Sequence, residues 1–276
     1  DVNGIIGSTT AIGTLTVNAS GTGTIAIEQI GDGDPASGSL GATIGNTGTT
    51  SVTFDGTEYT MNGATTVTAQ SGDSIIFSGG GATTFTTSND AITFGTGTVQ
   101  LSDAADLTIT SANGAVSVAS VGGTSSEDIT INAGTGTLAV GAIGNADEIN
   151  TVSLTSSTSI TLAGSITTSD QSGNSVTLAG PVIIDGTVVI DTDNDSNDGA
   201  IDFSTNTINA EGNGTDRLTV TSGGGTITMG GAVGGASPLD RFIVTIVLFH
   251  FQNTKDTLYK MIENFVLCNS LGQQIF

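Results

Sequence analysis

The feature that most constrains this chain is a repeat of short strand-like segments at an offset of 22 residues. Residues 106–123 and 128–145 align at this offset without a gap, with Asp, Gly and aliphatic residues at matching positions. Residues 217–235 repeat the pattern with one added residue, and residues 15–31 form a looser copy. A unit of this size cannot bury its apolar side chains alone, so successive units have to stack on one another.

Within and around these units, apolar residues alternate with small polar residues. The alternating segments are 15–17, 25–27, 52–54, 92–94, 107–109, 116–118, 129–131, 160–162 and 176–178. Period two with β-branched residues is typical of half-buried strands. Residues 1–240 show no 3.6-residue periodicity, so the sequence predicts an all-β fold for them.

Two all-β architectures fit the repeat. A longer repeat of about 110 residues, in which 91–94 recurs at 200–203 and 107–114 at 218–225, leaves tandem β-sandwich modules open. We favour a parallel β-solenoid with coils of about 22 residues, because the 22-residue copies are adjacent and are separated by tight glycine-containing corners. Aromatic residues make up only 4 % of the chain, and a narrow solenoid lumen is expected to hold few large rings.

The composition changes abruptly near Asp240 and divides the chain into residues 1–240 and 241–276. The first part holds one basic residue, Arg217, against 24 of the 26 acidic residues. The second part holds five of the ten Phe residues together with Arg241, Lys255, Lys260, His250 and Cys268. We therefore expect a β-solenoid repeat region over 1–240 and an atypical C-terminal tail over 241–276.

The tail admits two interpretations. Residues 242–251 form an apolar run that is too short for a membrane helix and predicts a final strand. Thr254 is suited to cap a short helix that would cover the open end of the solenoid. The apolar face of that helix would consist of Leu258, Met261, Ile262 and Phe265. The abrupt change in composition equally fits a truncated gene or a shifted reading frame.

Charge and composition exclude several functions. The net charge of −22 argues against nucleic acid, which requires clustered Lys and Arg, and against insertion into or binding of an anionic membrane. A single Cys excludes an intramolecular disulfide framework, and His250 in an apolar run is a poor catalytic base. Solenoid enzymes that act on polysaccharides line their clefts with aromatic and basic residues, which are scarce in 1–240. The sequence therefore predicts a protein that is not an enzyme.

One acidic stretch has the spacing of a calcium-binding loop. Residues 191–202 place Asp at positions 1, 3, 5 and 12, but Ser196 replaces the usual Gly and Asp202 the bidentate Glu. No helical pattern flanks the stretch, so an acidic corner stabilised by Asx turns is the alternative. The residues expected to bind calcium, as a stiffening ion, are Asp191, Asp193, Asp195 and Asp198. No other cofactor is expected.

Pairs of the form Thr-x-Thr recur along the chain. They are Thr14/Thr16, Thr22/Thr24, Thr66/Thr68, Thr96/Thr98, Thr108/Thr110, Thr135/Thr137, Thr219/Thr221 and Thr226/Thr228. Ice-binding solenoids carry such pairs on one flat face at a constant interval. These pairs follow no single interval, so we interpret Thr as the ordinary outward-facing residue of the strands.

Residues 199–239 carry a more specific pattern, GAIDF followed by DRLTVTSGGGTITMGGAVGGASPL. This pattern resembles the glycine-rich β-strand repeats of large bacterial surface proteins of the filamentous-haemagglutinin-like and autotransporter adhesin group. The resemblance extends over about residues 1–240. It implies an extracellular or cell-surface segment that forms a rigid acidic rod and contacts a host-cell, surface or matrix ligand, or another copy of itself.

Two further hypotheses remain open beside the adhesin segment. One is a calcium-stiffened subunit of an extracellular matrix or filament, and the other is a polysaccharide-active solenoid enzyme. No signal-peptide pattern follows Asp1, so we expect either that a signal peptide has been removed or that the chain is an internal fragment of a longer protein. Attachment to the outer membrane is expected through regions outside this chain.

Overall fold

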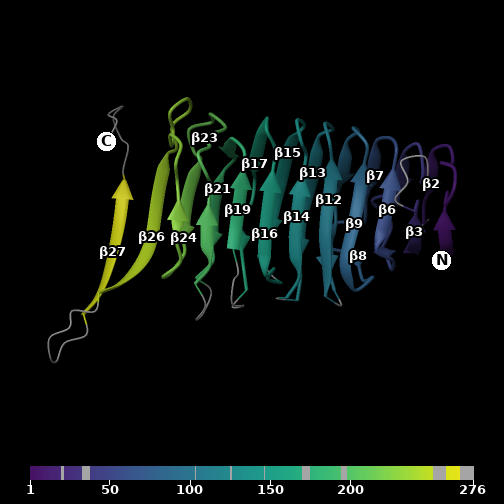
Figure 1. Cartoon of the computed structure of the whole chain (residues 1–276), viewed down its shortest axis with the longest axis horizontal. Helices are drawn as coiled ribbons and strands as arrows, with labels where there is room; N and C mark the ends of the chain where they lie inside the picture. The colour runs from purple at the N-terminus through teal and green to yellow at the C-terminus, as the bar shows by residue number, and fades with distance from the viewer. Residues whose placement is uncertain are drawn as a thin grey trace.

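The computed structural model describes residues 1–19, 22–32, 38–102, 104–124, 126–145, 147–169, 175–193, 198–250 and 259–267. Every regular element in these residues is a β-strand. The strands stack mainly in parallel as one β-solenoid of about nine turns with a spacing of roughly 24 residues (Figure 1). The predicted solenoid is confirmed, and the tandem-sandwich alternative is not what the chain forms.

The strands form three walls, which we name A, B and C, and most turns contribute one strand to each. Wall A contains β3 (Thr24–Ile30), β5 (Ser51–Phe54), β8 (Ser74–Phe77), β11 (Thr98–Leu101), β18 (Ile166–Thr167), β21 (Thr187–Asp191), β24 (Arg217–Thr221) and β26 (Arg241–His250). Wall B contains β2 (Leu15–Val17), β4 (Ala42–Ile44), β7 (Thr65–Val67), β10 (Ile92–Phe94), β17 (Ser159–Leu162), β20 (Val182–Ile184) and β23 (Ile208–Ala210).

Wall C contains β6 (Glu58–Met61), β9 (Gly81–Thr87), β12 (Ala105–Ser111), β14 (Asp128–Asn132), β16 (Thr151–Thr155), β19 (Ser175–Ala179), β22 (Ala200–Asp202) and β25 (Ile227–Thr228). The long strands β13 (Val116–Gly122) and β15 (Thr137–Ile143) run from wall B into wall A. At the N-terminal end, β1 (Val2–Ile6) pairs in parallel with β3.

The 22-residue offset read from the sequence is the register between neighbouring coils. Leu107 pairs with Ile129 in wall C, and Val116 pairs with Leu138 in wall B. Other coils are longer: Thr66 pairs with Thr93, a step of 27 residues. The walls stay in register because the additional residues are accommodated between the strands, which raises the mean spacing to roughly 24 residues.

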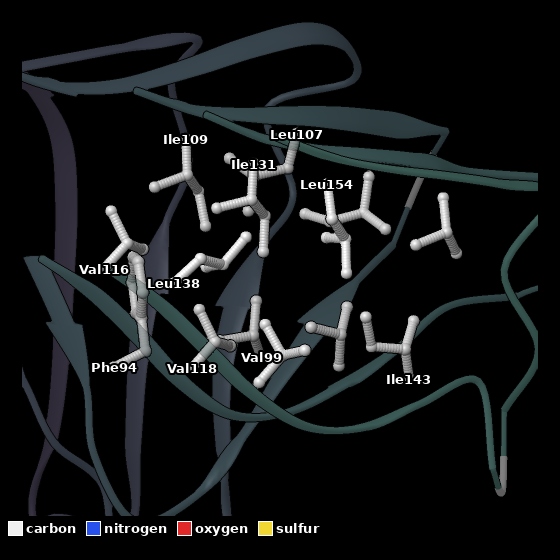
Figure 2. Packing of buried hydrophobic residues seen from close by; sticks show 14 of the residues in the cluster. Phe94, Val99, Leu107, Ile109, Val116, Val118, Ile131, Leu138, Ile143 and Leu154 are labelled. Carbon is white, nitrogen blue, oxygen red and sulfur yellow. The ribbon is translucent and has the colours of Figure 1, made fainter. Parts of the chain in front are cut away.

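The core is a set of aliphatic ladders that run along the solenoid axis. The ladder of wall A consists of Ile25, Val52, Ile75, Val99, Val121, Ile143, Ile166, Ile190, Val220 and Val244. Its members from Ile25 to Val220 are at most 6 % exposed. Figure 2 shows residues of all three walls pointing into one interior. Strand alternation therefore buries one side of every wall and leaves the other in water.

The N-terminal half of the lumen holds a cluster of five buried aromatic rings. They are Phe54, Tyr59, Phe77, Phe85 and Phe94. Phe54 and Phe77 occupy successive coils and stack with ring centroids 4.8 Å apart and an interplanar angle of 18°. The expectation that the lumen holds few large rings is wrong here, because the spacing between parallel strands is also a favourable stacking distance.

Tyr59 brings a hydroxyl group into this apolar interior. Its Oη accepts a hydrogen bond of 2.7 Å from the Gly56 N–H and donates to the Glu28 carbonyl oxygen at 3.1 Å. Burial raises the pKa of Tyr59 well above the usual range of a phenol. The hydroxyl therefore stays neutral and ties the corner after β5 to the coil before it.

The Asp that opens the repeated unit has a structural role between coils. The Asp106 carboxylate accepts the backbone N–H of Asp128 at 2.9 Å. Asp128 in turn accepts hydrogen bonds from Asn150 Nδ2 at 2.9 Å and Thr151 Oγ1 at 2.7 Å. Each of these two carboxylates thus binds the beginning of the next strand in wall C, which explains their place at the start of the two adjacent copies.

The C-terminal tail departs from the sequence prediction. The predicted last strand is present as β26, whose first half continues the ladder of β24 in parallel. Residues 259–267 form a second strand, β27 (Tyr259–Leu267), which pairs antiparallel with β26. The predicted helical face with Met261, Ile262 and Phe265 is therefore wrong, and Thr254 and Leu258 lie outside the described residues. Tyr, Ile, Phe and Val favour strands, and pairing with β26 satisfies the backbone.

Candidate functional site

The acidic corner between β21 and β22 contains the residues predicted to bind calcium. Asp191 Oδ1 accepts the backbone N–H of Asp193 at 3.0 Å, which is an Asx turn. Thr192 is buried and donates its hydroxyl to the Gly199 carbonyl oxygen at 2.8 Å, so the two ends of the corner are joined. Asp202 Oδ1 accepts the N–H of Ser204 at 2.6 Å and belongs to the following turn.

Asp193 and Asp198 approach one another over the corner of the next coil. A β-carbon built on Gly223 would lie closer than 3.0 Å to carboxylate oxygens of both residues. A β-carbon on Gly224 would also collide with the Asp198 carboxylate. The absence of side chains at Gly223 and Gly224 therefore creates the space in which these two carboxylates meet.

The corner brings together fewer of the predicted ligands than the spacing suggested. Asp193 and Asp198 converge, Asp191 is used in its own turn, and Asp195 lies outside the described residues. Within the described ranges no group of three or more His, Cys, Asp or Glu residues is arranged to hold a metal ion. The described residues thus offer a two-carboxylate site.

Wall B carries a ladder of hydroxyl-bearing residues on its outer side. Thr16, Thr43, Thr66, Thr93 and Ser117 pair in unbroken register and occupy five successive coils. Neighbouring members of this row are separated by unequal numbers of residues in the sequence. Unequal intervals between the Thr-x-Thr pairs therefore do not exclude their alignment on one face of the solenoid. The corners absorb the differences, and register follows the strands. We name this row of five residues the hydroxyl ladder.

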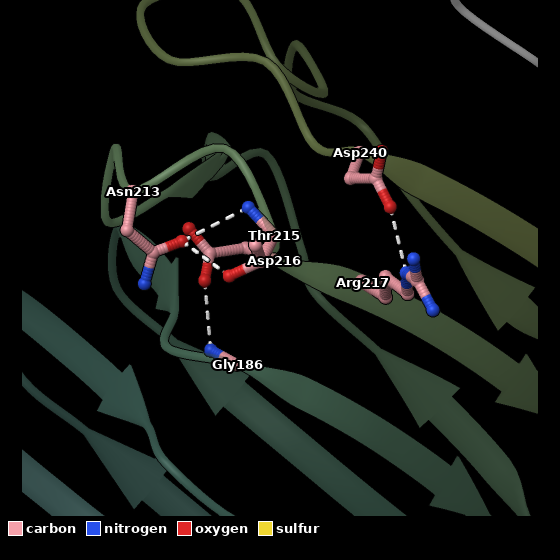
Figure 3. Close-up of polar contacts among 6 residues, drawn as sticks. All are labelled: Gly186, Asn213, Thr215, Asp216, Arg217 and Asp240. Carbon is pink, nitrogen blue, oxygen red and sulfur yellow. Dashed lines mark hydrogen bonds and ion pairs between the residues drawn. The ribbon is translucent and has the colours of Figure 1, made fainter.

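A second acidic corner was missed in the sequence because its members come from neighbouring coils. Asp216 is fully buried and accepts the N–H of Gly186 at 2.8 Å (Figure 3). It also accepts the N–H of Gly212 at 3.3 Å. The exposed Glu211 has a raised pKa, first because of the charge of Asp185 and also because of Asp216. Asp216 therefore anchors the corner, and Asp185 and Glu211 repel each other on its surface.

Glu127 is a buried carboxylate that stabilises the corner before β14. Its side chain accepts the N–H of Thr124 at 2.5 Å and the N–H of Ser126 at 3.3 Å, and it also binds the Thr124 hydroxyl. Burial alone would raise the pKa of Glu127, but the bonds from the Thr124 hydroxyl and from these backbone N–H groups outweigh it and lower the pKa. The ionised form is thus built into the fold.

Replacing Glu127 with Gln is expected to lower the free energy of unfolding at neutral pH by about 1–3 kcal/mol, because a carboxylate with several donors is lost. The depressed pKa means that Glu127 contributes stability above its unfolded pKa of about 4.3 and loses it as the pH falls through the lower folded value. Urea unfolding at several pH values measures both effects. The outward-facing Glu58→Gln serves as control; equal losses for both variants at neutral pH would contradict the assignment.

Two residues of the kinds that line sugar-binding clefts, Tyr59 and Arg217, are engaged in other contacts. Tyr59 is fully buried in the lumen. Arg217 forms an ion pair with Asp240, with Nε and Oδ2 2.7 Å apart (Figure 3).

No helix among the described residues is long and apolar enough to cross a membrane. No protein-family model, curated protein or solved structure matches this chain.

Proposed function

We propose that this chain is a non-enzymatic structural and adhesive segment of a secreted or cell-surface bacterial adhesin-like protein. In this role the solenoid is a stiff, acidic rod that presents an outer face to a host-cell, surface or matrix ligand. The observation that carries the proposal is the unbroken aliphatic ladder of wall A, from Ile25 to Val244.

The ladder supports a mechanical role because it joins all coils into one body. Every coil is held to its neighbours by backbone pairing in three walls and by contiguous side-chain packing in the lumen. At the strand spacing of about 4.8 Å, nine turns give a rod of about 43 Å. The net charge of −22 favours solubility and opposes lateral association of such rods.

The placement of Tyr59 supports a binding role over polysaccharide cleavage. A cleft that acts on sugars needs aromatic or basic side chains at its surface, and the ring of Tyr59 is enclosed in the lumen. Wall B instead offers the hydroxyl ladder, a regular surface of small side chains on which Thr43, Thr66 and Ser117 are exposed.

The adhesive role can be tested with beads that carry the full chain. We expect the beads to be retained on mucin or collagen layers beyond their retention on albumin. The double variant Thr43→Lys/Thr66→Lys should abolish the difference, whereas Thr108→Lys/Thr130→Lys on the outer side of wall C should leave it unchanged. Retention no greater than on albumin, or equal loss with both variants, would contradict an adhesive face on wall B.

The convergence of Asp193 and Asp198 over Gly223 favours a second candidate, a filament segment stiffened by calcium. Carboxylate oxygens are suitable calcium ligands, and binding to the folded state alone adds about 2.7 kcal/mol at about 100 times Kd. We expect calcium, but not magnesium, to raise the melting temperature, and Asp193→Asn to remove the increase. Asp202→Asn is the matched control. A melting temperature that is independent of calcium would exclude this candidate.

A further inference from the structure

The corner between β23 and β24 holds an Asn-Gly pair in an unusual setting. Residues 211–215 are all exposed. Asn213 Oδ1 accepts two hydrogen bonds from Thr215, one from its backbone N–H at 3.0 Å and one from its Oγ1 at 2.9 Å (Figure 3). The side-chain amide of Asn213 is therefore held in place by the residue two positions further along the chain.

This arrangement prepares the Asn213 amide for attack by its own backbone. Two donors aimed at Oδ1 polarise the carbonyl group and stabilise the negative charge that develops on this oxygen when a nucleophile adds to Cγ. The nearest nucleophile is the backbone nitrogen of Gly214. Gly214 has φ of 79°, and a β-carbon at this residue would meet no atom within 4 Å. The space on the side-chain side of this residue is therefore open.

We propose that Asn213 is a site of spontaneous deamidation in the folded protein, with Thr215 as the group that promotes it. The Gly214 nitrogen forms a bond to Asn213 Cγ and loses its proton to solvent. The C–N bond of the side-chain amide breaks, and ammonia leaves. Water then opens the resulting succinimide at either carbonyl group and gives aspartate or isoaspartate. The net reaction converts asparagine and water into aspartate or isoaspartate and ammonia. It requires no oxidant, reductant or enzyme.

The other Asn-Gly pairs of the described residues are restrained. The N–H of Gly114, whose nitrogen would have to attack Asn113, donates to Ser111 Oγ at 2.8 Å. A β-carbon on Gly63, which follows Asn62, would overlap the Leu40 carbonyl group, so this backbone is tightly packed.

At the N-terminal end, the Gly4 N–H is bound by the Glu28 carboxylate. These contacts have to break before the corresponding succinimide can close. The four Asn-Gly pairs of the described residues are therefore expected to deamidate at different rates in the folded protein.

Deamidation at Asn213 would add charge to an acidic corner. Asp216, three residues later, already anchors Gly186 and Gly212, and Glu211 and Asp185 repel each other nearby. A new carboxylate increases this repulsion, and isoaspartate also lengthens the backbone by one carbon. The modification therefore affects the corner that leads into β24.

The test is incubation of the full chain at mildly alkaline pH, digestion with a Glu- and Asp-specific protease, and mass spectrometry of the peptides. We expect Asn213 to convert first, while Asn62 and Asn113 remain largely intact. Thr215→Val should slow the reaction at Asn213 roughly two- to tenfold, the factor that one net hydrogen bond provides. Thr215→Ser, which keeps the hydroxyl group, should restore the rate.

Unfolding in urea separates the contribution of the fold from that of the dipeptide. In urea the Asn-Gly pairs should react at similar rates, and the effect of Thr215→Val should largely disappear. Equal rates at Asn113 and Asn213 in the folded protein would overturn the proposal. An unchanged rate in folded Thr215→Val would overturn the role of the Thr215 hydroxyl.

Discussion

Replacing Val140 with Asp is expected to destabilise the solenoid by more than about 4 kcal/mol, which is comparable to the whole stability of a small domain. Val140 is 2 % exposed and lies in a ladder between Val118 and Leu162. A carboxyl group at this position has no partner in the lumen, and burying a charge or an unpaired polar group is costly. Urea unfolding followed by circular dichroism measures the loss.

The neighbouring residue provides a matched control in the same strand. Ala139 is exposed on the outer side of wall B, so Ala139→Asp should change the free energy of unfolding by no more than about 0.5 kcal/mol. The two variants introduce the same side chain one position apart. Similar losses for both would contradict the alternation of buried and exposed residues in β15.

Replacing Phe77 with Ala is expected to lower the free energy of unfolding by about 3–5 kcal/mol. Phe77 is fully buried, stacks on Phe54, and lies within ring contact of Tyr59, Phe85 and Phe94. Removing its ring leaves a cavity that the strands cannot close, since their backbones are fixed by parallel pairing on both sides.

Phe77→Leu tests whether the loss comes from packing volume. This variant keeps most of the apolar volume and should lose about 1.5 kcal/mol or less. Chemical denaturation of both variants beside the wild type gives the comparison. A loss below about 1 kcal/mol for Phe77→Ala would mean that the rings do not pack as one cluster.

The fold was predictable from sequence because the signal is repeated in every coil. Leu107, Ile109 and Val116 recur 22 residues later, and these residues pair directly across neighbouring coils. Strand alternation is a local property, and two adjacent coils of equal length repeat at a single offset, so a sequence pattern can report both. The mean coil length of roughly 24 residues was not predicted, because the corners vary in length without disturbing the walls.

The C-terminal tail shows where local patterns are insufficient. Met261, Ile262 and Phe265 have helical spacing, yet residues 259–267 pair with β26 as a strand. The apolar residues of a short segment fit both periodicities, and the long partner strand decides between them. The aromatic cluster was missed for a related reason, since Phe54 and Phe85 are 31 residues apart and come into ring contact only after the coils have stacked.

The candidate sites were only partly predictable. The spacing of Asp191, Asp193 and Asp198 marked an acidic corner, but the meeting of two carboxylates over Gly223 depends on the next coil. The pair of Asp185 and Glu211 and the hydroxyl ladder also join residues of different coils. Contacts between coils can be predicted only when the pairing register of the strands is known. The corners vary in length, so this register cannot be read from the sequence spacing.

The central claim, one continuous stack of parallel coils, is tested most directly by distances between spin labels on the outer side of wall B. In a Cys268→Ser background, labels at Thr16 and Ala139 are five coil steps apart, and labels at Thr16 and Ile183 are seven steps apart. At about 4.8 Å per step, the label attachment points should be separated by about 24 Å and about 34 Å. Pulsed electron–electron resonance should give narrow distributions that increase in this proportion. Equal distances for the two pairs, or broad distributions, would contradict the stack.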